Sequence, residues 1–401
     1  MLNSHYQNEL AQLRRLANEF AQTNPALAPL LGIDSASDPD VERLLEGVAF
    51  LTGMVRQRLD DEFPEFIQEL AQLLYPHYLQ PLPCMTLLQF QPRAALQAPV
   101  HIEAGCEVFS VPVDGQRVRF RSTAPVDLEP LQLLSSQWEG GSGQERSIVL
   151  NFSLTVANPN DWKSDSLRFY LGGGLADASK LMRLLQLNLR EIRIAAPGQP
   201  VTLLPAKYLR SVGFDTNNQL LPFPNNAHPA YRCLQEYFAL PEKFLFVELS
   251  GFQQWHAREA GGQFSVRLMF ENLPDWTMEL SSNSFMLGVT PAINLFNQQA
   301  HPLRIDHKQT DYRIQPADHG QRMSIRIHSI LNVSAYVAGD GERPLKQFNT
   351  FSQHDTYNLR IRASSIDMHG YDHYISLPYS EGKIPSEMTL SIDLLCTNGK
   401  L

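Results

Sequence analysis

The sequence predicts an α+β protein in which a helical N-terminal segment precedes β-rich, sandwich-like domains. Up to about residue 84, apolar residues recur at three- and four-residue steps, which is the period of an amphipathic helix. Beyond Pro83 the period changes to two, as in strands with one buried face. We therefore expect a helical bundle-forming region at 1–84, a first β-rich domain at 85–200 and a second at 201–401.

Composition and charge exclude several classes of function. The chain has 401 residues, of which 43% are hydrophobic and 19% charged, and its net charge is -9. Because the acidic excess is spread along the chain, we expect no nucleic-acid partner. We find neither an apolar window long enough to insert in a membrane nor a secretion signal, so we expect a cytoplasmic protein. The four cysteines are isolated, and we expect no metal site and no cofactor.

The first helix is expected from Ser4 to Gln22. It carries a narrow apolar seam whose spacing alternates between four and three residues, as in a coiled coil. The seam consists of Tyr6, Leu10, Leu13, Ala17 and Phe20. It packs either on the helices that follow in the same chain or in a bundle with helices from other chains.

A helical hairpin is expected from Asp38 to Pro83. Asp38 and Pro39 are typical of a helix start, and we expect this helix to end near Asp61. Pro64 then begins a second helix, which stops at Tyr75-Pro76. The first of these helices carries an apolar stripe that we expect to be core, formed by Val41, Leu44, Leu45, Val48, Leu51, Val55 and Leu59.

The same helix has a second apolar line on its opposite side, formed by Gly47, Phe50 and Met54 among charged residues. A helix that faces solvent on this side does not need such a line. Either a later part of the same chain covers it, or a second polypeptide does.

One helix is expected to interrupt the strands, at Asp177 to Gln186, with Leu181, Leu184 and Leu185 facing inward. A triple glycine at 172–174 precedes it. No Gly-Lys-Ser/Thr follows these glycines, so they indicate a turn with positive φ rather than a phosphate loop.

A short helix rich in aromatic residues is expected within Leu220 to Leu249. We expect its apolar residues to form the hub of a core, and these are Tyr231, Leu234, Tyr237 and Phe238. The same helix carries charged residues that allow acid-base chemistry, namely Arg232 and Glu236, with His228 before it. Nothing near them supplies a nucleophile, so a structural Arg-Glu pair is the favoured interpretation.

Two further features are weighed as alternatives to a scaffold. The sequence His369-Gly-Tyr-Asp372-His373 resembles a metal motif, but Gly370 disfavours the helix such a motif needs, so a polar surface loop is expected. A carbohydrate-binding or hydrolytic β-sandwich is the alternative function. It would use exposed tryptophans, yet Trp138, Trp162, Trp255 and Trp276 are scattered, and we expect most of them in cores or interfaces.

Several blocks of the sequence resemble, in order, the signature blocks of the TssF family, also called VasA or ImpG. These blocks are DPDVERLLEGVAFLTGMVRQRLDDEFPE with LLYPHYLQPLP, LLPFP with YRCLQEYFALPEKFLFVEL, GVTPAINLF and LLCTNG. Two departures stand out. Ala230 replaces a glycine that is usual before the Tyr-Arg pair, and the family continues past the last block, so we expect a C-terminal portion to be missing after 401.

The resemblance implies a non-enzymatic subunit of the type VI secretion baseplate wedge, with no catalytic residues. In the family, two TssF copies embrace one TssG, and the wedge also holds TssK and TssE; six wedges surround the VgrG spike and carry the sheath. The resemblance also implies a baseplate docked at the inner membrane. With the two apolar lines, it favours a shared helical bundle formed by Tyr6, Leu10, Leu13, Phe20, Gly47, Phe50 and Met54.

Overall fold

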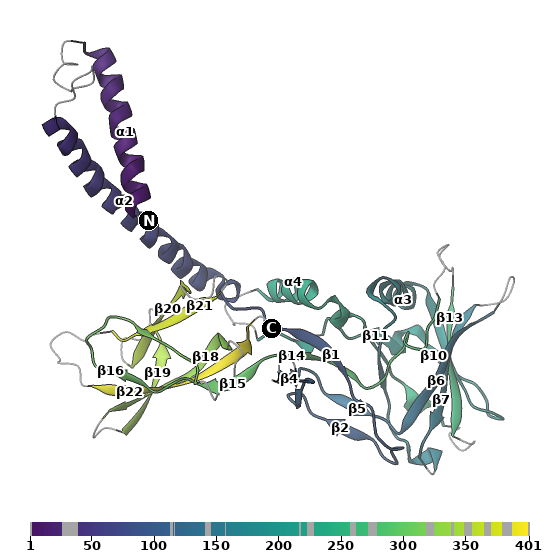
Figure 1. Ribbon diagram of the computed structural model, residues 1–401. Coiled ribbons are helices and arrows are strands. Elements are labelled where there is room, and N and C mark those ends of the chain that lie inside the picture. The colour runs from purple at the N-terminus through teal and green to yellow at the C-terminus, as the bar shows by residue number, and fades with distance from the viewer. Residues whose placement is uncertain are drawn as a thin grey trace.

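The computed structural model describes a helical hairpin and an elongated β body (Figure 1). The described residues are 2–25, 39–112, 115, 117–140, 146–156, 158–215, 218–222, 228–256, 262–271, 279–317, 325–337, 341–348, 355–364, 370–378 and 387–399. Two long helices come first, and strands with a few shorter helices among them follow. The predicted α+β class is therefore confirmed.

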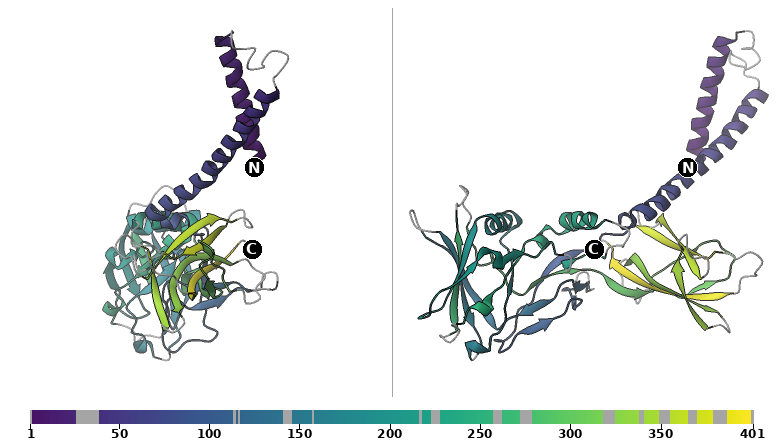
Figure 2. Two further views of the ribbon diagram at one scale, coloured as in Figure 1. Left: turned by 90° about the vertical axis from the view of Figure 1, so that its left-hand side faces the viewer. Right: turned by 180° about the vertical axis from the view of Figure 1, so that it is seen from behind.

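The hairpin consists of α1 (Leu2–Thr23) and α2 (Pro39–Leu74), which run antiparallel and rise from the body (Figures 1 and 2). The predicted hairpin within Asp38 to Pro83 is wrong, because α2 is one continuous helix of 36 residues. Pro64 lacks an N–H and removes one i→i−4 bond, to Asp60. Asp60 is exposed, so water can satisfy the carbonyl that loses this bond, and the helix continues past Pro64.

α1 packs closely on one side of α2. Ala49 is fully buried there, and a Cβ added to Gly53 would lie 3.1 Å from the backbone nitrogen of Tyr6. Ion pairs run along the edges of this contact, joining Arg56 to Glu9 at 2.8 Å, Arg14 to Glu42 at 2.6 Å and His5 to Asp60 at 3.8 Å. The small residues therefore set the distance between the helices, and the charges flank it.

The strands of the body are short, and most pair antiparallel. They are β1 (Met85–Gln89), β2 (Val100–Ile102), β3 (Glu107–Phe109), β4 (Arg119–Ser122), β5 (Val126–Leu128), β6 (Leu131–Glu139), β7 (Ser147–Leu154), β8 (Leu167–Tyr170), β9 (Leu189–Ala195), β10 (Thr202–Pro205), β11 (Leu209–Ser211), β12 (Phe246–Leu249), β13 (Gln263–Phe270), β14 (Val289–Ile293), β15 (Phe296–Gln299), β16 (Leu303–Ile305), β17 (Tyr312–Arg313), β18 (Ile325–Val337), β19 (Gly341–Gln347), β20 (Thr356–Ala363), β21 (Tyr371–Ser376) and β22 (Met388–Asn398).

The half of the body farther from the hairpin contains the largest core. Its sheet has the order β10-β9-β13-β7-β6, and helix α3 (Leu175–Leu187) and the sheet β11-β12-β8 pack with it. The predicted inward leucines of α3 are buried, and Gly173 and Gly174 have φ of 92° and 105°, as the predicted turn requires.

The boundary predicted at residue 200 falls inside this sheet. β13 comes from the second predicted domain, yet it pairs with β7 and β9 of the first. The strand order along a sheet is set by hydrogen bonds between distant segments, which periodicity cannot reveal. β1, at the start of the first predicted domain, likewise pairs with β14.

The other half is a separate sheet near the foot of the hairpin, with the order β15-β22-β18-β19-β20-β21-β17. β22 pairs with β15, β16 and β18, and its buried residues include Leu390, Ile392, Leu394 and Cys396. This sheet has its own core, distinct from that of the first half.

Candidate functional site

The outer surface of α2 is apolar and uncovered. The stripe predicted to be core is instead exposed at Leu44, Val48, Leu51, Val55 and Leu59, by 40–68%. Only Val41 and Leu45 of the predicted stripe are half-buried. The prediction is wrong because α1 packs on the side with Ala49 and Gly53, where small side chains let two helix backbones approach closely.

The second apolar line of α2 is exposed as well. Phe50 is 44% and Met54 47% exposed, and no described part of the chain covers them. Gly47 lies beside them, and a Cβ added there would meet no atom within 4 Å. Both faces of α2 that α1 leaves free are therefore uncovered by the part of the chain that the structure describes.

The sides of α2 follow from helix geometry. At 100° per residue, Ala49 marks the side covered by α1, the exposed stripe lies about 120° away in one direction, and Phe50 with Met54 lies about 120° away in the other. A helix that is apolar all round is normally buried in the centre of a bundle. α2 also carries charged residues, but its apolar residues lie on three sides, of which α1 covers one and no described residue covers the other two.

The predicted seam of α1 is divided by the structure. Tyr6, Leu10 and Leu13 are half-buried on the side that faces α2, so they are available to another chain only in part. Phe20 and its neighbour Leu16 are each 47% exposed, at the end of α1 farthest from the body. Of the predicted partner-binding residues, Phe20, Gly47, Phe50 and Met54 are the open ones.

The two glycines of α2 give a direct prediction. Gly47→Ala is expected to raise the free energy of unfolding of the isolated chain by about 0.5–1 kcal/mol, because an exposed helical glycine costs backbone entropy. Gly53→Val is expected to destabilise, since its side chain would push Tyr6 away. Urea denaturation followed by circular dichroism at 222 nm measures both. Equal shifts of the two midpoints would contradict the packing of α1 on Gly53.

A second helix is exposed on its apolar side. In α4 (Pro229–Ala239), Tyr231, Leu234, Tyr237 and Phe238 are all exposed, Phe238 by 82%, so the predicted core hub is wrong. The buried residue of this helix is Glu236. A charged side chain holds α4 to the body, because the chain offers it buried partners that compensate for its desolvation.

These partners of Glu236 lie on three segments. Its Oε1 accepts hydrogen bonds from the backbone N–H groups of Leu220 at 2.9 Å and Leu221 at 3.1 Å. Its Oε2 pairs with the buried ammonium of Lys243, and the guanidinium of Arg232 lies 3.8 Å from Oε1. The favoured structural Arg-Glu pair is thus confirmed, and Lys243 is a partner that spacing along a helix does not reveal.

The remaining candidates for catalysis have structural roles. Nδ1 of His228 accepts a hydrogen bond from the backbone N–H of Ala230 and caps α4. His369 lies outside the described residues. The predicted surface loop is wrong at His373, which is buried in β21, because His373 and Ile375 alternate inward along that strand. Asp372 pairs with Arg313 at 2.8 Å.

No group of three or more histidine, cysteine, aspartate or glutamate side chains that would suit a metal ion occurs within the described ranges. Trp162 and Trp255 are buried and Trp138 is half-buried, as predicted, so these three form no exposed sugar platform. Trp276 lies outside the described residues. Among the helices that the structure describes, none has the length and apolar character needed to cross a membrane.

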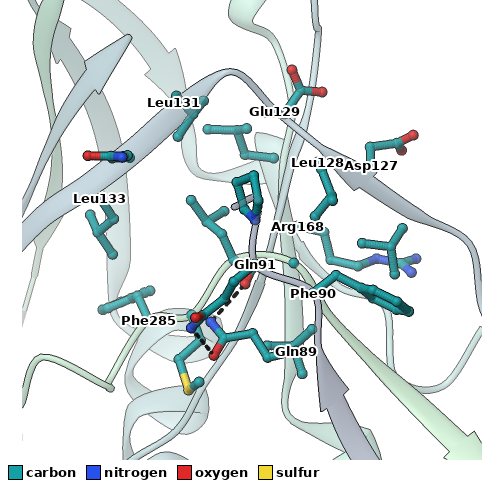
Figure 3. Close-up of a pocket in the computed structure, with 18 of the residues that line it drawn as sticks. Gln89, Phe90, Gln91, Asp127, Leu128, Glu129, Leu131, Leu133, Arg168 and Phe285 are labelled. Carbon is teal, nitrogen blue, oxygen red and sulfur yellow. Dashed lines mark hydrogen bonds between the residues drawn. The ribbon is translucent and has the colours of Figure 1, made fainter. Parts of the chain in front are cut away.

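One cleft, with a volume of about 580 Å³, lies where β1, β5 and β8 meet (Figure 3). Gln91 donates a hydrogen bond to Gln89 at 2.9 Å, and Gln89 donates to the carbonyl of Leu287 at 3.1 Å. The guanidinium of Arg168 and these amides give the cleft donors for binding. No histidine or cysteine is among the residues that line it.

The carboxylates of this cleft are held by the chain itself. Glu129 accepts hydrogen bonds from the indole of Trp162 at 2.8 Å and from Ser164 at 2.6 Å. Asp127 contacts His101 at 2.5 Å and, with the nearby Glu103, raises the pKa of that imidazole. The acidic groups therefore stabilise the loops around the cleft.

An elongated body with uncovered apolar helices is typical of subunits that other chains of an assembly complete. The family comparison defines that assembly. A profile of the family described as "Type VI secretion system, TssF" matches residues 1–401, so the chain belongs to the TssF family.

Individual relatives agree with this assignment. The chain is 32% identical over 370 residues to the type VI secretion system component TssF1 of Pseudomonas aeruginosa, a match that covers 86% of this chain and 59% of that protein. The chain thus spans less than two thirds of the length of this relative.

Solved structures share the fold. A chain in the type VI secretion system TssK-TssF-TssG baseplate subcomplex, seen by cryo-electron microscopy, matches with a TM-score of 0.76 and 26% identity, over 90% of this chain and 68% of that one. A chain in the type VI baseplate complex matches with a TM-score of 0.57 and 24% identity, over 100% of this chain and 71% of that one; at this identity the likeness concerns the fold alone.

Proposed function

We propose that this chain is a non-enzymatic structural subunit of the type VI secretion baseplate wedge. The observation that carries the proposal is α2, whose two apolar sides have no cover among the described residues. These sides fit a helical bundle shared with TssG and a second TssF copy, in which Phe50 and Met54 meet one neighbour and Leu51 and Val55 meet the other. The TssK-TssF-TssG subcomplex of the structural relative supports this choice of partners.

The remaining partners are assigned to the β body. We propose that its two halves contact TssK and TssE and that the assembled wedges surround the VgrG spike and carry the sheath. The assembly works in the cytoplasm and docks at the inner membrane. The chemistry is that of packing, since the buried polar groups that are described hold loops and strands together.

Two substitutions on the second apolar line test the bundle. Phe50→Asp with Met54→Asp is expected to weaken the affinity for the cognate TssG by at least about 100-fold. The substitutions remove the apolar contacts of Phe50 and Met54, worth several kcal/mol, and place two carboxylates in an apolar interface. The change is measured by pull-down at a series of TssG concentrations. The isolated variant should keep its helical content, since both side chains are exposed on the outside of α2.

The matched control places the same charge elsewhere on the hairpin. Gln12→Asp with Asn18→Asp alters two exposed polar residues of α1 and should leave the affinity for TssG within about twofold. If the Phe50 and Met54 variant is folded and still binds TssG as the unaltered chain does, the bundle is wrong.

A further inference from the structure

A short crossing of the chain joins two parts of the β body. The described strands β1 to β14 form sheets of their own, which we call the far part, and β15 to β22 form the sheet near the hairpin, which we call the near sheet. Among these strands, the chain passes from the far part to the near sheet once, at Asn294 and Leu295, between β14 and β15 (Figure 1). A single crossing between two packed bodies is a usual place for a hinge.

Asn294 occupies this crossing and is fully buried. Its Nδ2 donates hydrogen bonds to the carbonyl of Arg119 in β4 at 2.6 Å and to Oδ1 of Asn398 in β22 at 2.8 Å. Its Oδ1 accepts hydrogen bonds from the hydroxyl of Thr397 and from the backbone N–H of Asn398, both at 2.8 Å. The four hydrogen bonds that a side-chain amide can form are therefore made, one to the far part and three to the near sheet.

The orientation of this amide follows from the chemistry of its partners. The carbonyl of Arg119 can only accept and the backbone N–H of Asn398 can only donate, so the amide nitrogen must face the first and the amide oxygen the second. The backbone N–H of Asn294 also donates to the carbonyl of Cys84, just before β1, at 2.8 Å. One residue thus bonds to the chain at the start of β1, to β4 and to the end of β22.

Apolar contacts surround the amide of Asn294. Leu295 is buried in a cluster that also contains Ile293 of the far part and Leu395 of the near sheet. The guanidinium of Arg119 lies 5.4 Å from the ring centroid of Phe296 in the near sheet. Apolar contacts have little directional preference and hold the two parts together without fixing their angle, whereas hydrogen bonds weaken when their direction changes.

We propose that the side chain of Asn294 is a lock that holds the far part and the near sheet at one relative orientation. Without this amide, the carbonyl of Arg119 and the N–H of Asn398 lose their partner in a buried place, and water must enter to satisfy them. A joint opened in this way can rotate at Asn294 and Leu295. Because α2 contacts β20 of the near sheet, the lock also sets the direction of the hairpin relative to the far part. This inference is independent of the proposed bundle, since its test needs no partner.

The test measures distances within the whole chain by double electron–electron resonance. Genetically encoded spin labels, which avoid the free cysteines, replace the exposed residues Gln186 of α3 and Thr389 of β22. A reference pair at Gln186 and the exposed Gln137 of β6 lies within the far part and shows whether that part is folded. Asn294→Leu is expected to broaden the distance distribution between 186 and 389 by at least about twofold and to leave that of the reference pair unchanged.

The matched control is Asn218→Leu, which alters another buried asparagine. Its amide donates to the carbonyl of Val212 at 2.6 Å, within the far part, so this variant should leave the distribution between 186 and 389 unchanged.

A milder variant guards against a failure to fold. Thr397→Val removes one donor to Asn294 at nearly constant volume and should broaden the distribution between 186 and 389 by less than Asn294→Leu does. If the reference pair broadens in Asn294→Leu, that variant is unfolded and Thr397→Val decides. An unchanged distribution between 186 and 389 in the deciding variant overturns the lock, and so does equal broadening by Asn218→Leu.

Discussion

Replacing Glu236 by alanine is expected to lower the free energy of unfolding by about 3–5 kcal/mol, because it leaves the buried ammonium of Lys243 without its carboxylate. The backbone N–H groups of Leu220 and Leu221 also lose their acceptor. Urea denaturation followed by intrinsic fluorescence measures the loss. Glu236→Gln is expected to cost less than alanine, since an amide oxygen can still accept from Leu220 and Leu221.

Two controls make the origin of this loss specific. Glu387→Ala removes the exposed partner of Arg304 and should change the free energy of unfolding by no more than about 1 kcal/mol. The double variant Glu236→Leu with Lys243→Met should be more stable than either single variant, because it removes the buried ammonium together with its carboxylate. Additive losses in the double variant would show that Glu236 and Lys243 act independently.

Acid is expected to destabilise the sheet near the hairpin through two buried histidines. The pKa of His328 and that of His373 are both lowered to about 4, mainly by burial. His373 contributes to the shift at His328, whereas Asp372 opposes the shift at His373. In the unfolded chain the two imidazoles take up a proton near pH 6.5, whereas in the folded chain they do so only near pH 4. Stability is therefore full above pH 6.5 and falls as the pH drops toward 4, by on the order of 3 kcal/mol for each histidine.

The measurement is the urea midpoint at pH 7.5, 6.5, 5.5 and 4.5. His328→Leu with His373→Leu should flatten the fall between pH 6.5 and 4.5. His101→Gln should not flatten it, because its hydrogen bond to Asp127 raises the pKa of His101 and its contribution has the opposite sign. If the urea midpoint of the double leucine variant falls with pH as steeply as that of the unaltered chain, groups other than His328 and His373 cause the acid sensitivity.

The sequence alone predicts those parts of the fold that local pattern controls. The alternation of Ile148, Leu150 and Phe152 indicates a half-buried strand, and Leu181, Leu184 and Leu185 indicate the inward side of a helix. In both cases one face is buried by neighbouring structure of the same chain. Local pattern therefore identifies the buried face of each element, although Ser147 and Val149, on the other face of β7, are buried as well.

The errors at the exposed helix faces have one physical cause. Leu51, Val55 and Phe238 have the pattern of core residues but are exposed, because periodicity shows that a face is apolar and not which molecule covers it. A usable signal was present in α2, whose apolar residues extend over more of its circumference than one packed neighbour requires. Lys243, the partner of Glu236, was missed because no spacing rule connects a helix to the turn after it.

The position of Pro64 has a mechanical consequence. It lies in α2 between the part covered by α1 and the foot near the body, and it removes one backbone bond at that point. The stretch of α2 from Pro39 to Pro64 forms an arm about 38 Å long, so a bend of about 20° there would move its tip by roughly 13 Å. A bend at Pro64 would thus change the direction of the hairpin while the β body stayed unchanged.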